Sequence, residues 1–171
     1  VEEIACTATG RSIIAAATVA AARTVLNVAS ADFLIFEHQQ VSGTDGGTFT
    51  NGGWTTVPIN TEVCDTGSIG SLAANIITLA AGTYRFSGWM NGFSVDDAQS
   101  RLFNVDTASV IAYGRCTTGA GSSTIISVIE GRFTLAIATQ VRLEAQCTTT
   151  QITNGFGKAL SFGTEVYAGL S

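Results

Sequence analysis

The pattern of apolar and polar positions changes at Asp32, and from there onward it predicts β-strands. The segment FLIFEHQ, residues 33–39, is bulky at odd and even positions alike, which suits a strand covered on both faces. The segment QVRLEAQC, residues 140–147, alternates cleanly between apolar and polar side chains. Its apolar side chains, which we expect to face inward, are Val141, Leu143, Ala145 and Cys147.

Other strands are expected between turn signals rich in glycine, threonine and asparagine. They cover residues 55–63, two strands in 76–95 that meet at Ala81 and Gly82, a hairpin in 101–114, and segments 124–136 and 162–170. Pro58 predicts an edge or bulged strand, because proline cannot donate to a central ladder. Gly131 predicts a bulge or turn.

In the last strand Val166, Ala168 and Leu170 are expected on one face. About eight to ten strands without a helix predict an all-β antiparallel sandwich of jelly-roll type.

Residues 1–31 differ from this pattern, since they contain no aromatic residue and are dominated by alanine. Thr18 suits a helix N-cap, VAAARTVL favours helix, and Asn27 suits a left-handed C-cap. We therefore expect a short α-helical stem, with its helix at about 18–26, followed by one domain at 32–171. The stem residues expected to pack on or near one stripe are Ile14, Ala17, Ala21, Val25 and Val28.

The segment SIIAAATVAAA resembles the core of a signal peptide, but Glu2 and Glu3 precede it and Arg23 follows, so we do not expect one. The chain starts at Val1 rather than Met, as a piece of a longer product would. No run of eighteen apolar residues is present, so we expect no helical membrane insertion.

Charge is sparse in this chain of 171 residues. Charged residues make up 12%, about half of the usual share of roughly a quarter. The net charge is −5, and no cluster of Lys or Arg is present. Phosphate binding needs clustered cations, so nucleic acid is not an expected partner. Few charges with ordinary apolar content suggest that part of the surface is buried against other copies of the chain.

Cys6, Cys64, Cys116 and Cys147 are widely spaced and form no CxxC pair, so a zinc site is not expected. Buried free thiols are the favoured interpretation, with one bridge such as Cys116 to Cys147 left open. Calcium ligands are conceivable at Asp45 in the TDGGT loop, or at Asp96 with Asp97, but neither has EF-hand spacing. We expect no metal and no cofactor.

The sequence offers little for catalysis. His38 is the single histidine, at the end of an apolar strand, where structural or interfacial roles are commoner than catalytic ones. No Gly-x-Ser-x-Gly elbow occurs. The adjacent pair Asp96 and Asp97 fits a turn better than a pair of catalytic acids. We therefore do not expect an enzyme.

Binding is the better candidate. Trp54 follows a Gly-Gly turn, and an exposed indole there would suit stacking on a sugar ring, although packing beneath its own loop is the plainer alternative. The loop TTTQITNGFG, with Asn154, and the loop TTGAGSST carry small polar residues suited to hydrogen bonding with glycans, or to ordinary surface turns. Trp54 and Asn154 are the candidate ligand-binding residues.

Residues 33–171 resemble the C1q and tumour-necrosis-factor-like jelly roll. The stretch ITLAAGTYRFSGWM contains the family's Gly-x-Tyr-x-Phe pattern at Gly82, Tyr84 and Phe86, and the closing FGTEVYAGL fits loosely at Phe162 and Gly163. The resemblance implies a homotrimer whose inner sheets pack around a threefold axis with aromatic residues. The expected trimer-interface residues are Phe33, Ile35, Tyr84, Phe86 and Trp89. Trp89 is expected on the opposite face of its strand from Tyr84 and Phe86.

The stem has a second resemblance. AAATVAAARTVLNVA is similar to the AAAARTALGL segments of bacteriophage tail-fibre and related virion-fibre proteins, with Asn27 in place of the usual glycine. There such a segment precedes a terminal receptor-binding or assembly domain. Small residues also allow three chains to approach one axis closely.

Together these features predict a phage virion structural protein, a trimeric fibre or spike whose jelly roll contacts a host surface, through a glycan in the favoured version. Residues 1–31 would attach it to a fibre shaft or to the capsid. Its expected location is the virion, assembled in the host cytoplasm and exposed extracellularly. The alternatives are a capsid decoration or head-fibre protein with a purely structural role, and a cellular C1q-like lectin or adhesin.

Overall fold

The computed structural model describes residues 32–171 together with Ala15, Thr18 and Ala21. The chain divides into two compact units, 1–32 and 33–171, and each is considered by itself.

In the first unit the Thr18 hydroxyl accepts a hydrogen bond from the Ala21 amide over 3.1 Å. A hydroxyl that accepts from the amide three residues ahead is the arrangement of a helix N-cap. The other predicted stem-packing residues, Ile14, Ala17, Val25 and Val28, lie outside the described residues, as does most of the predicted helix.

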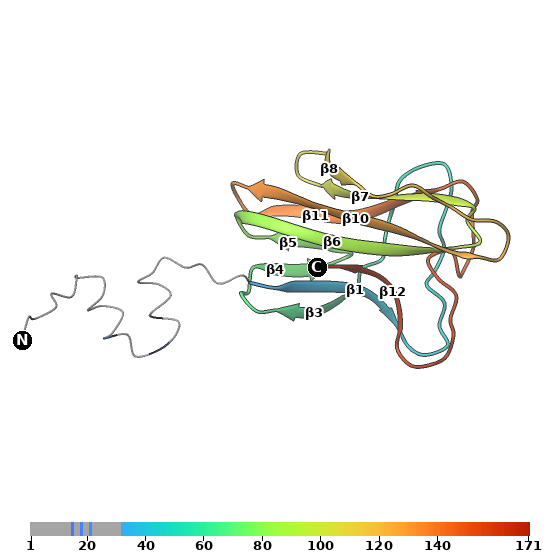
Figure 1. Ribbon diagram of the computed structural model, residues 1–171, viewed down its shortest axis with the longest axis horizontal. Helices are drawn as coiled ribbons and strands as arrows, with labels where there is room; N and C mark the ends of the chain where they lie inside the picture. Colours follow the sequence, from blue (N-terminus) through green and yellow to red (C-terminus); the bar gives the residue numbers. More distant parts are fainter. Residues whose placement is uncertain (1–14, 16–17, 19–20, 22–31) are drawn as a thin grey trace, which may run out of the picture. The chain divides into compact units, whose positions relative to one another are not determined.

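The second unit is a sandwich of twelve β-strands (Figure 1). They are β1 (Leu34–Gln40), β2 (Thr55–Thr56), β3 (Thr61–Asp65), β4 (Gly70–Ala73), β5 (Ile76–Leu79), β6 (Gly82–Phe93), β7 (Asp97–Asn104), β8 (Ser109–Tyr113), β9 (Thr117–Thr118), β10 (Thr124–Leu135), β11 (Thr139–Cys147) and β12 (Glu165–Leu170).

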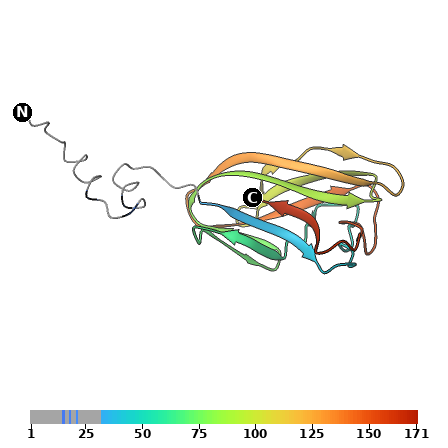
Figure 2. The same ribbon diagram turned by 60° about the horizontal axis from the view of Figure 1, so that its bottom comes forward.

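The strands form two antiparallel sheets, which Figure 2 shows as two layers. One sheet has five strands in the order β10-β6-β12-β1-β3. The other has seven, in the order β4-β5-β11-β7-β8, with β2 paired to β11 and β9 paired to β7. Because β12 lies between β1 and β6, the five-stranded sheet is built from segments far apart in the sequence.

The core lies between the sheets and follows the alternation read from the sequence. On β11 the four residues expected to face inward, Val141, Leu143, Ala145 and Cys147, are all buried. From the five-stranded sheet, Phe36, Met90 and Ile129 meet them. The prediction of two strands in residues 76–95 is also confirmed. The first, β5, ends at Leu79, and the second, β6, begins at Gly82.

The predicted strand around Pro58 is wrong in one respect. Residues 55–63 are not one edge strand, because β2 belongs to the seven-stranded sheet and β3 to the five-stranded sheet. Between them the chain crosses from one layer to the other and buries Val57 and Ile59 in the core. Pro58 therefore lies in the crossover, where no ladder hydrogen bond is required of it.

Two further differences arise from packing. Gly131 is neither a bulge nor a turn, because β10 pairs with β6 without a register shift from Thr124 to Leu135. A Cβ at Gly131 would lie 2.8 Å from the Phe86 ring, so the missing side chain makes room for that ring. In β12 a register shift opposite His38 and Gln39 buries Tyr167, while Val166 is only half-buried.

The cysteines that the structure describes are all free thiols. Only Cys147 is buried, while Cys64 is half-buried and Cys116 is exposed, which corrects the expectation of uniformly buried thiols. Cys147 faces the core from β11, and no bridge joins it to Cys116. Among the described residues no helix is long and apolar enough to cross a membrane.

Candidate interaction surfaces

The outer face of the five-stranded sheet carries three of the predicted interface residues. Strands β6 and β10 pair in continuous register, so the odd residues of β6 and the even residues of β10 point away from the core. Trp89 therefore faces outward, with Val128 beside it on β10 and Gly169 beside it on β12. Phe33, just before β1, and Ile35 on β1 approach the same face at odd positions, whereas Leu34 and Phe36 pack into the core.

Trp89 lies against the backbone of the neighbouring strand. A Cβ at Gly169 would be 3.0 Å from the Trp89 Nε1 atom, so the indole occupies the space that a side chain at this position would take. The ring is half-buried by this contact and still presents part of its surface to solvent. Its position is fixed by the sheet itself rather than by a loop.

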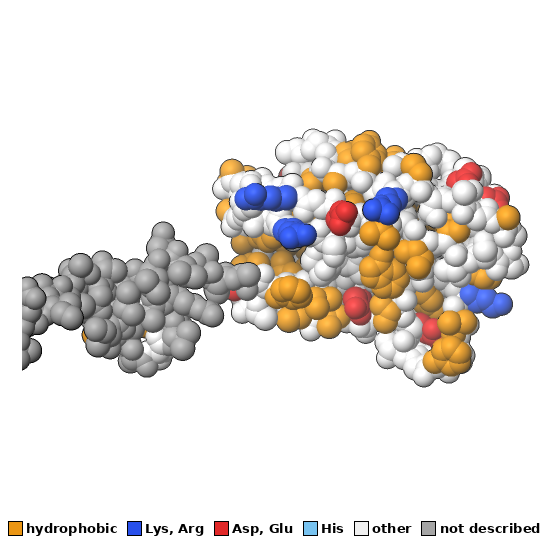
Figure 3. Space-filling model, viewed as in Figure 1, with side chains coloured by type: hydrophobic (Ala, Val, Ile, Leu, Met, Phe, Trp, Pro, Cys, Tyr) orange, Lys and Arg blue, Asp and Glu red, His pale blue; other side chains and the backbone are white. Residues whose placement is uncertain are grey.

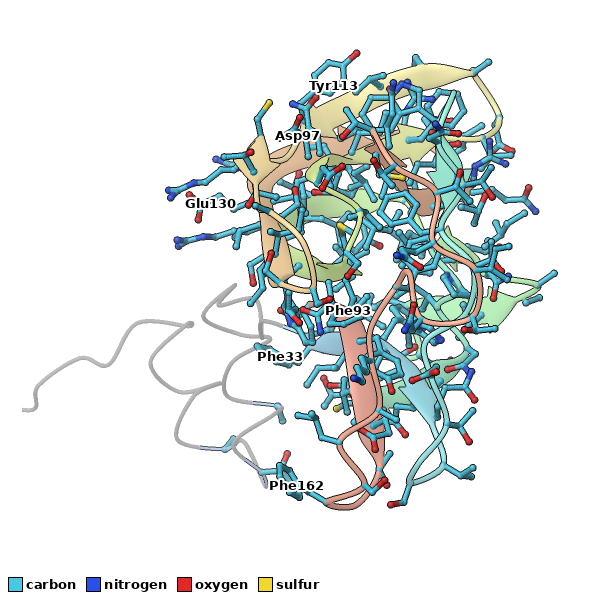
Figure 4. All side chains as sticks on the ribbon, turned by 90° about the vertical axis from the view of Figure 1, so that its right-hand side faces the viewer. Phe33, Phe93, Asp97, Tyr113, Glu130 and Phe162 are labelled. Carbon is cyan, nitrogen blue, oxygen red and sulfur yellow. The ribbon has the colours of Figure 1, made fainter. Side chains whose placement is uncertain are left out.

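Val128 and Ile126 on β10 and Ile35 on β1 lie on the two sides of Trp89, while Phe33 lies four residues before Glu37, the β1 residue in the same row as Trp89. Val128 is 40% exposed, Ile126 is 52% exposed, and Phe33 is 57% exposed. Figure 3 shows hydrophobic side chains on this face among charged and polar ones, and in Figure 4 Glu130 lies near Asp97, with Phe33 lower in the view. We refer to Phe33, Ile35, Trp89, Ile126 and Val128 as the apolar face.

Charges of both signs border the apolar face. Arg85 on β6 is directly opposite Arg132 on β10, and Glu130 and Glu37 lie at outward positions of β10 and β1. None of these four groups forms a salt bridge within the described part of the chain. Like charges directly opposite each other repel, so the arginine pair would be stabilised by a carboxylate from another molecule.

Tyr84 and Phe86 do not belong to this surface, which corrects two of the predicted interface residues. Phe86 is buried between the sheets, and Tyr84 packs partly buried against the same core. The Tyr84 hydroxyl donates to the Ala80 carbonyl over 2.9 Å. Even positions of β6 point inward, so these two rings stabilise their own sandwich and are not available to a neighbour.

The outer face of the seven-stranded sheet holds the second cluster. Pairing across β8, β7, β11 and β2 aligns Tyr113, Arg101, Glu144 and Thr56 in one row. Glu144 is 1% exposed, and its carboxylate accepts hydrogen bonds from Arg101 Nε over 2.5 Å and from Arg142 Nε over 2.7 Å. The buried carboxylate is therefore paired with two arginine side chains, as a buried charge requires.

Trp54 packs on this ion-pair network. The Arg101 guanidinium lies 4.1 Å from the centre of the Trp54 ring and 4.7 Å from the centre of the Phe103 ring, so it is held between two aromatic faces. Tyr113 is tilted against Trp54 with 6.0 Å between ring centres. One face of Trp54 is thus occupied by the protein itself, whereas Tyr113 is 59% exposed.

The sequence predicts that Arg142 and Glu144 lie on one face of their strand. It does not predict that Arg101, from another strand, contacts Glu144. The alternation in QVRLEAQC puts Arg142 and Glu144 outward, yet only the pairing of β7 with β11 brings Arg101 to the same carboxylate. Tyr113, Ile126 and Val128 were likewise not identified as candidates from the sequence.

Asn154 belongs to a different neighbourhood from Trp54. It bridges to Gly47, and its side-chain Oδ1 is buried without a hydrogen-bond partner in the described region. Its carbonyl accepts from the Gly157 amide over 3.0 Å, so the residue helps to shape the loop that precedes β12. The two predicted ligand-binding residues therefore do not form one site.

The acidic residues considered for calcium have structural partners. Asp45 accepts from the Ala159 amide over 2.8 Å, and Asp96 accepts from the Thr149 hydroxyl. No group of three His, Cys, Asp or Glu side chains suited to a metal occurs among the residues that the structure describes. His38 is buried against the Tyr167 ring.

Comparison with solved structures identifies the architecture. The globular domain of the zebrafish complement 1qA protein superposes with a TM-score of 0.51 at 14% identity, covering 81% of this chain and 94% of that one. Murine APRIL superposes with a TM-score of 0.54 at 11% identity, covering 81% and 96%. No protein-family model and no curated protein sequence matches the chain. The predicted all-β jelly roll of the C1q and tumour-necrosis-factor-like type is confirmed as the fold.

Proposed function

We propose that this chain is the subunit of a trimeric virion fibre or spike, in which the jelly roll is exposed for attachment to a host surface, and that its apolar face joins the three copies. The observation that carries the proposal is the apolar face itself. Trp89, Ile126 and Val128 form one group at outward positions of β6 and β10, and Ile35 and Phe33 lie at outward positions on β1 and just before it. Exposed apolar side chains on one face of a sheet mark an interaction surface.

Self-association is favoured over a different partner by the charges around this face. Arg85 and Arg132 on one copy could meet Glu130 or Glu37 on the next, which satisfies both signs with a single repeated contact. Closed rings of identical chains are the usual form of such contacts. The fold shared with the complement and APRIL domains is compatible with this arrangement.

The assignment to a virion rests on the stem. The AAATVAAARTVLNVA segment resembles those that precede the terminal domains of phage fibre proteins, and its small residues would let three chains approach one axis. In this proposal the stem anchors the protein to a fibre shaft or capsid, and the host partner is a surface glycan.

The oligomer is tested by light scattering during gel filtration of the full chain. A mass of three times 17.6 kDa is expected at micromolar concentration. The substitution Val128→Glu, at a site that is already exposed, should leave the fold intact and give monomers. Ile137→Glu changes an exposed apolar residue in the turn between β10 and β11 and should remain trimeric. A monomeric wild-type chain would refute the trimer.

The location is tested separately with antibodies raised against residues 33–171. In electron micrographs of host-cell lysates, gold-labelled antibodies should bind to the fibres or spikes of virus particles. Labelling spread over the capsid shell would favour the decoration alternative, and labelling of cell surfaces without particles would favour the cellular lectin.

A further inference from the structure

We propose that a hollow on the outer face of the seven-stranded sheet binds neutral sugar units. This inference rests on the proposed attachment to glycans and assigns that function to a specific surface. The hollow has a volume of about 390 Å³ and lies over β7, β9 and β11. Six of its lining residues are Asp97, Gln99, Cys116, Thr118, Gln146 and Thr148.

The polar groups of the hollow are available to a ligand. Within the described part of the chain, the Gln146 amide, the Asp97 carboxylate and the Thr118 hydroxyl form no side-chain hydrogen bond. Gln99 is held in place because its Nε2 donates to the Gly114 carbonyl over 3.0 Å, which leaves its side-chain oxygen free to accept. A sugar hydroxyl both donates and accepts, so amide, carboxylate and hydroxyl groups together match its chemistry.

An exposed aromatic ring, which is not one of the lining residues, lies on the same sheet face as the hollow. Arg101 is two residues from Gln99 on the same face of β7, and Tyr113 is directly opposite Arg101 on β8. Tyr113 is exposed and its ring is supported from one side by Trp54. An aromatic face of this kind offers the apolar area on which the C–H face of a sugar can pack. The role that the sequence suggested for Trp54 therefore passes to Tyr113.

Charge favours neutral over acidic sugars. Of the two arginines next to the hollow, Arg101 is already bound to Glu144 and covered by Trp54, and Arg115 precedes the lining residue Cys116 without being a lining residue itself. The lining residues include no Lys or Arg, and Asp97 would repel a carboxylate or a phosphate. A neutral hexose or N-acetylhexosamine meets no such repulsion.

The hollow lies on a different sheet from the apolar face, and the two meet where the Arg115 amide, next to the lining residue Cys116, donates to the Val128 carbonyl on β10. The hollow belongs to the seven-stranded sheet, whereas the apolar face belongs to the five-stranded sheet. In Figure 4, Tyr113 and Asp97 lie toward the top of the view, apart from Phe33 and Phe93. A trimer would carry three such hollows, and multivalent binding would compensate for weak single sites.

The test uses the full-length protein on an array of neutral and sialylated glycans, followed by titration of the best neutral glycan by calorimetry. Gln146→Ala and Tyr113→Ala should each weaken binding at least tenfold. Gln140→Ala is the matched control, because Gln140 is an exposed glutamine on the same strand and face, six residues away. It should bind like the wild type.

The outcomes separate this inference from the proposed function. Neutral-glycan binding that survives both Gln146→Ala and Tyr113→Ala would overturn the hollow but leave glycan attachment standing. Binding to sialylated glycans alone would overturn the neutral-sugar assignment. A third outcome is that light scattering shows a trimer but no glycan binds. This result would overturn both the sugar-binding hollow and the proposed attachment to glycans, and it would leave the proposed trimer unaffected.

Discussion

At the scale of single residues, His38 has the most direct consequence for stability. Its side chain is 1% exposed, its ring lies 5.4 Å from the Tyr167 ring, and its Nδ1 has no partner in the described part of the chain. Burial lowers the pKa of His38 from 6.5 to about 4, because the charged imidazolium would lose its hydration.

This shift predicts a loss of stability in mild acid. Between pH 6.5 and 4 the unfolded chain binds a proton at His38 that the folded chain does not, so the free energy of unfolding falls as the pH falls. From pH 7 to pH 4.5 the loss should be about 2.5 kcal/mol from this residue. Urea unfolding of the wild type and of His38→Gln should show the difference, with a flatter pH profile in the variant. Equal slopes in both proteins would contradict it.

Gly131 gives a second prediction at this scale. Gly131→Ala puts a Cβ within 2.8 Å of the Phe86 ring, and we expect about 1–3 kcal/mol of destabilisation from overpacking. Gly53→Ala is the matched control, since a Cβ at Gly53 would meet nothing within 4 Å, and it should change stability by about 0.5 kcal/mol or less. Denaturant unfolding of the two variants measures both values. A Gly131→Ala protein as stable as the control would show that Phe86 moves aside without cost.

The sequence predicts which face a strand residue occupies better than it predicts what that residue contacts. Alternation put Trp89 opposite Tyr84 and Phe86, and the sheet has this arrangement. The same alternation could not show that Tyr84 and Phe86 are the inward pair, because both faces of β6 carry aromatic rings. Trp54 follows no periodic pattern, so its contact with Arg101 depended on pairing that brings distant strands together.

At the scale of elements, Glu144 links three strands. Its carboxylate on β11 binds Arg101 from β7, and the Trp54 that precedes β2 covers the Arg101 guanidinium. The short β2, with two residues, has few backbone hydrogen bonds of its own. We therefore expect side-chain contacts to hold it against β11.

Removing the carboxylate should loosen this region. Glu144→Leu leaves two arginines without their shared partner and should cost about 3 kcal/mol in the free energy of unfolding. Trp54 should also become more mobile, which fluorescence anisotropy in a Trp89→Phe background would detect. Gln140→Leu, an exposed site on the same strand and face, should have an effect within about 0.5 kcal/mol. A neutral effect of Glu144→Leu would mean that β2 is held by its backbone alone.

Strands with a clear alternation of apolar and polar residues could be predicted from the sequence. Strands whose position depends on pairing with distant segments could not. Strands β6, β10 and β11 are long and regular, and the sequence placed them correctly. Strand β4 has no alternating pattern of bulky residues and was missed. The split of residues 55–63 into β2 and β3 was also missed, because a crossover that buries Val57 and Ile59 has the same apolar content as a strand.

At the scale of the whole molecule, the domain has two outer faces with different chemistry. One presents the apolar face and charges of both signs, and the other presents an ion-pair network and a hollow lined by both polar and apolar atoms. The sequence indicated the fold and the excess of apolar surface. It could not indicate the hollow, because the residues that line it come from three strands and two loops.

Self-association should make thermal stability depend on concentration. For a trimer that unfolds to separate chains, Tm should rise by about 2–4 °C for each tenfold increase in protein concentration. The Val128→Glu variant should show a Tm that is lower and independent of concentration. Differential scanning calorimetry over a hundredfold range distinguishes the two. A constant Tm for the wild type, together with a monomeric mass, would count against association.

The central place of β12 has a consequence for misassembly. Because this strand fills the slot between β1 and β6, a chain cleaved before Glu165 would expose two unpaired backbone edges within one sheet. Such edges template the addition of foreign strands, so the cleaved protein should polymerise or capture the EVYAGL segment of an intact neighbour. A synthetic peptide of that sequence should then act as a donor strand and suppress the aggregation.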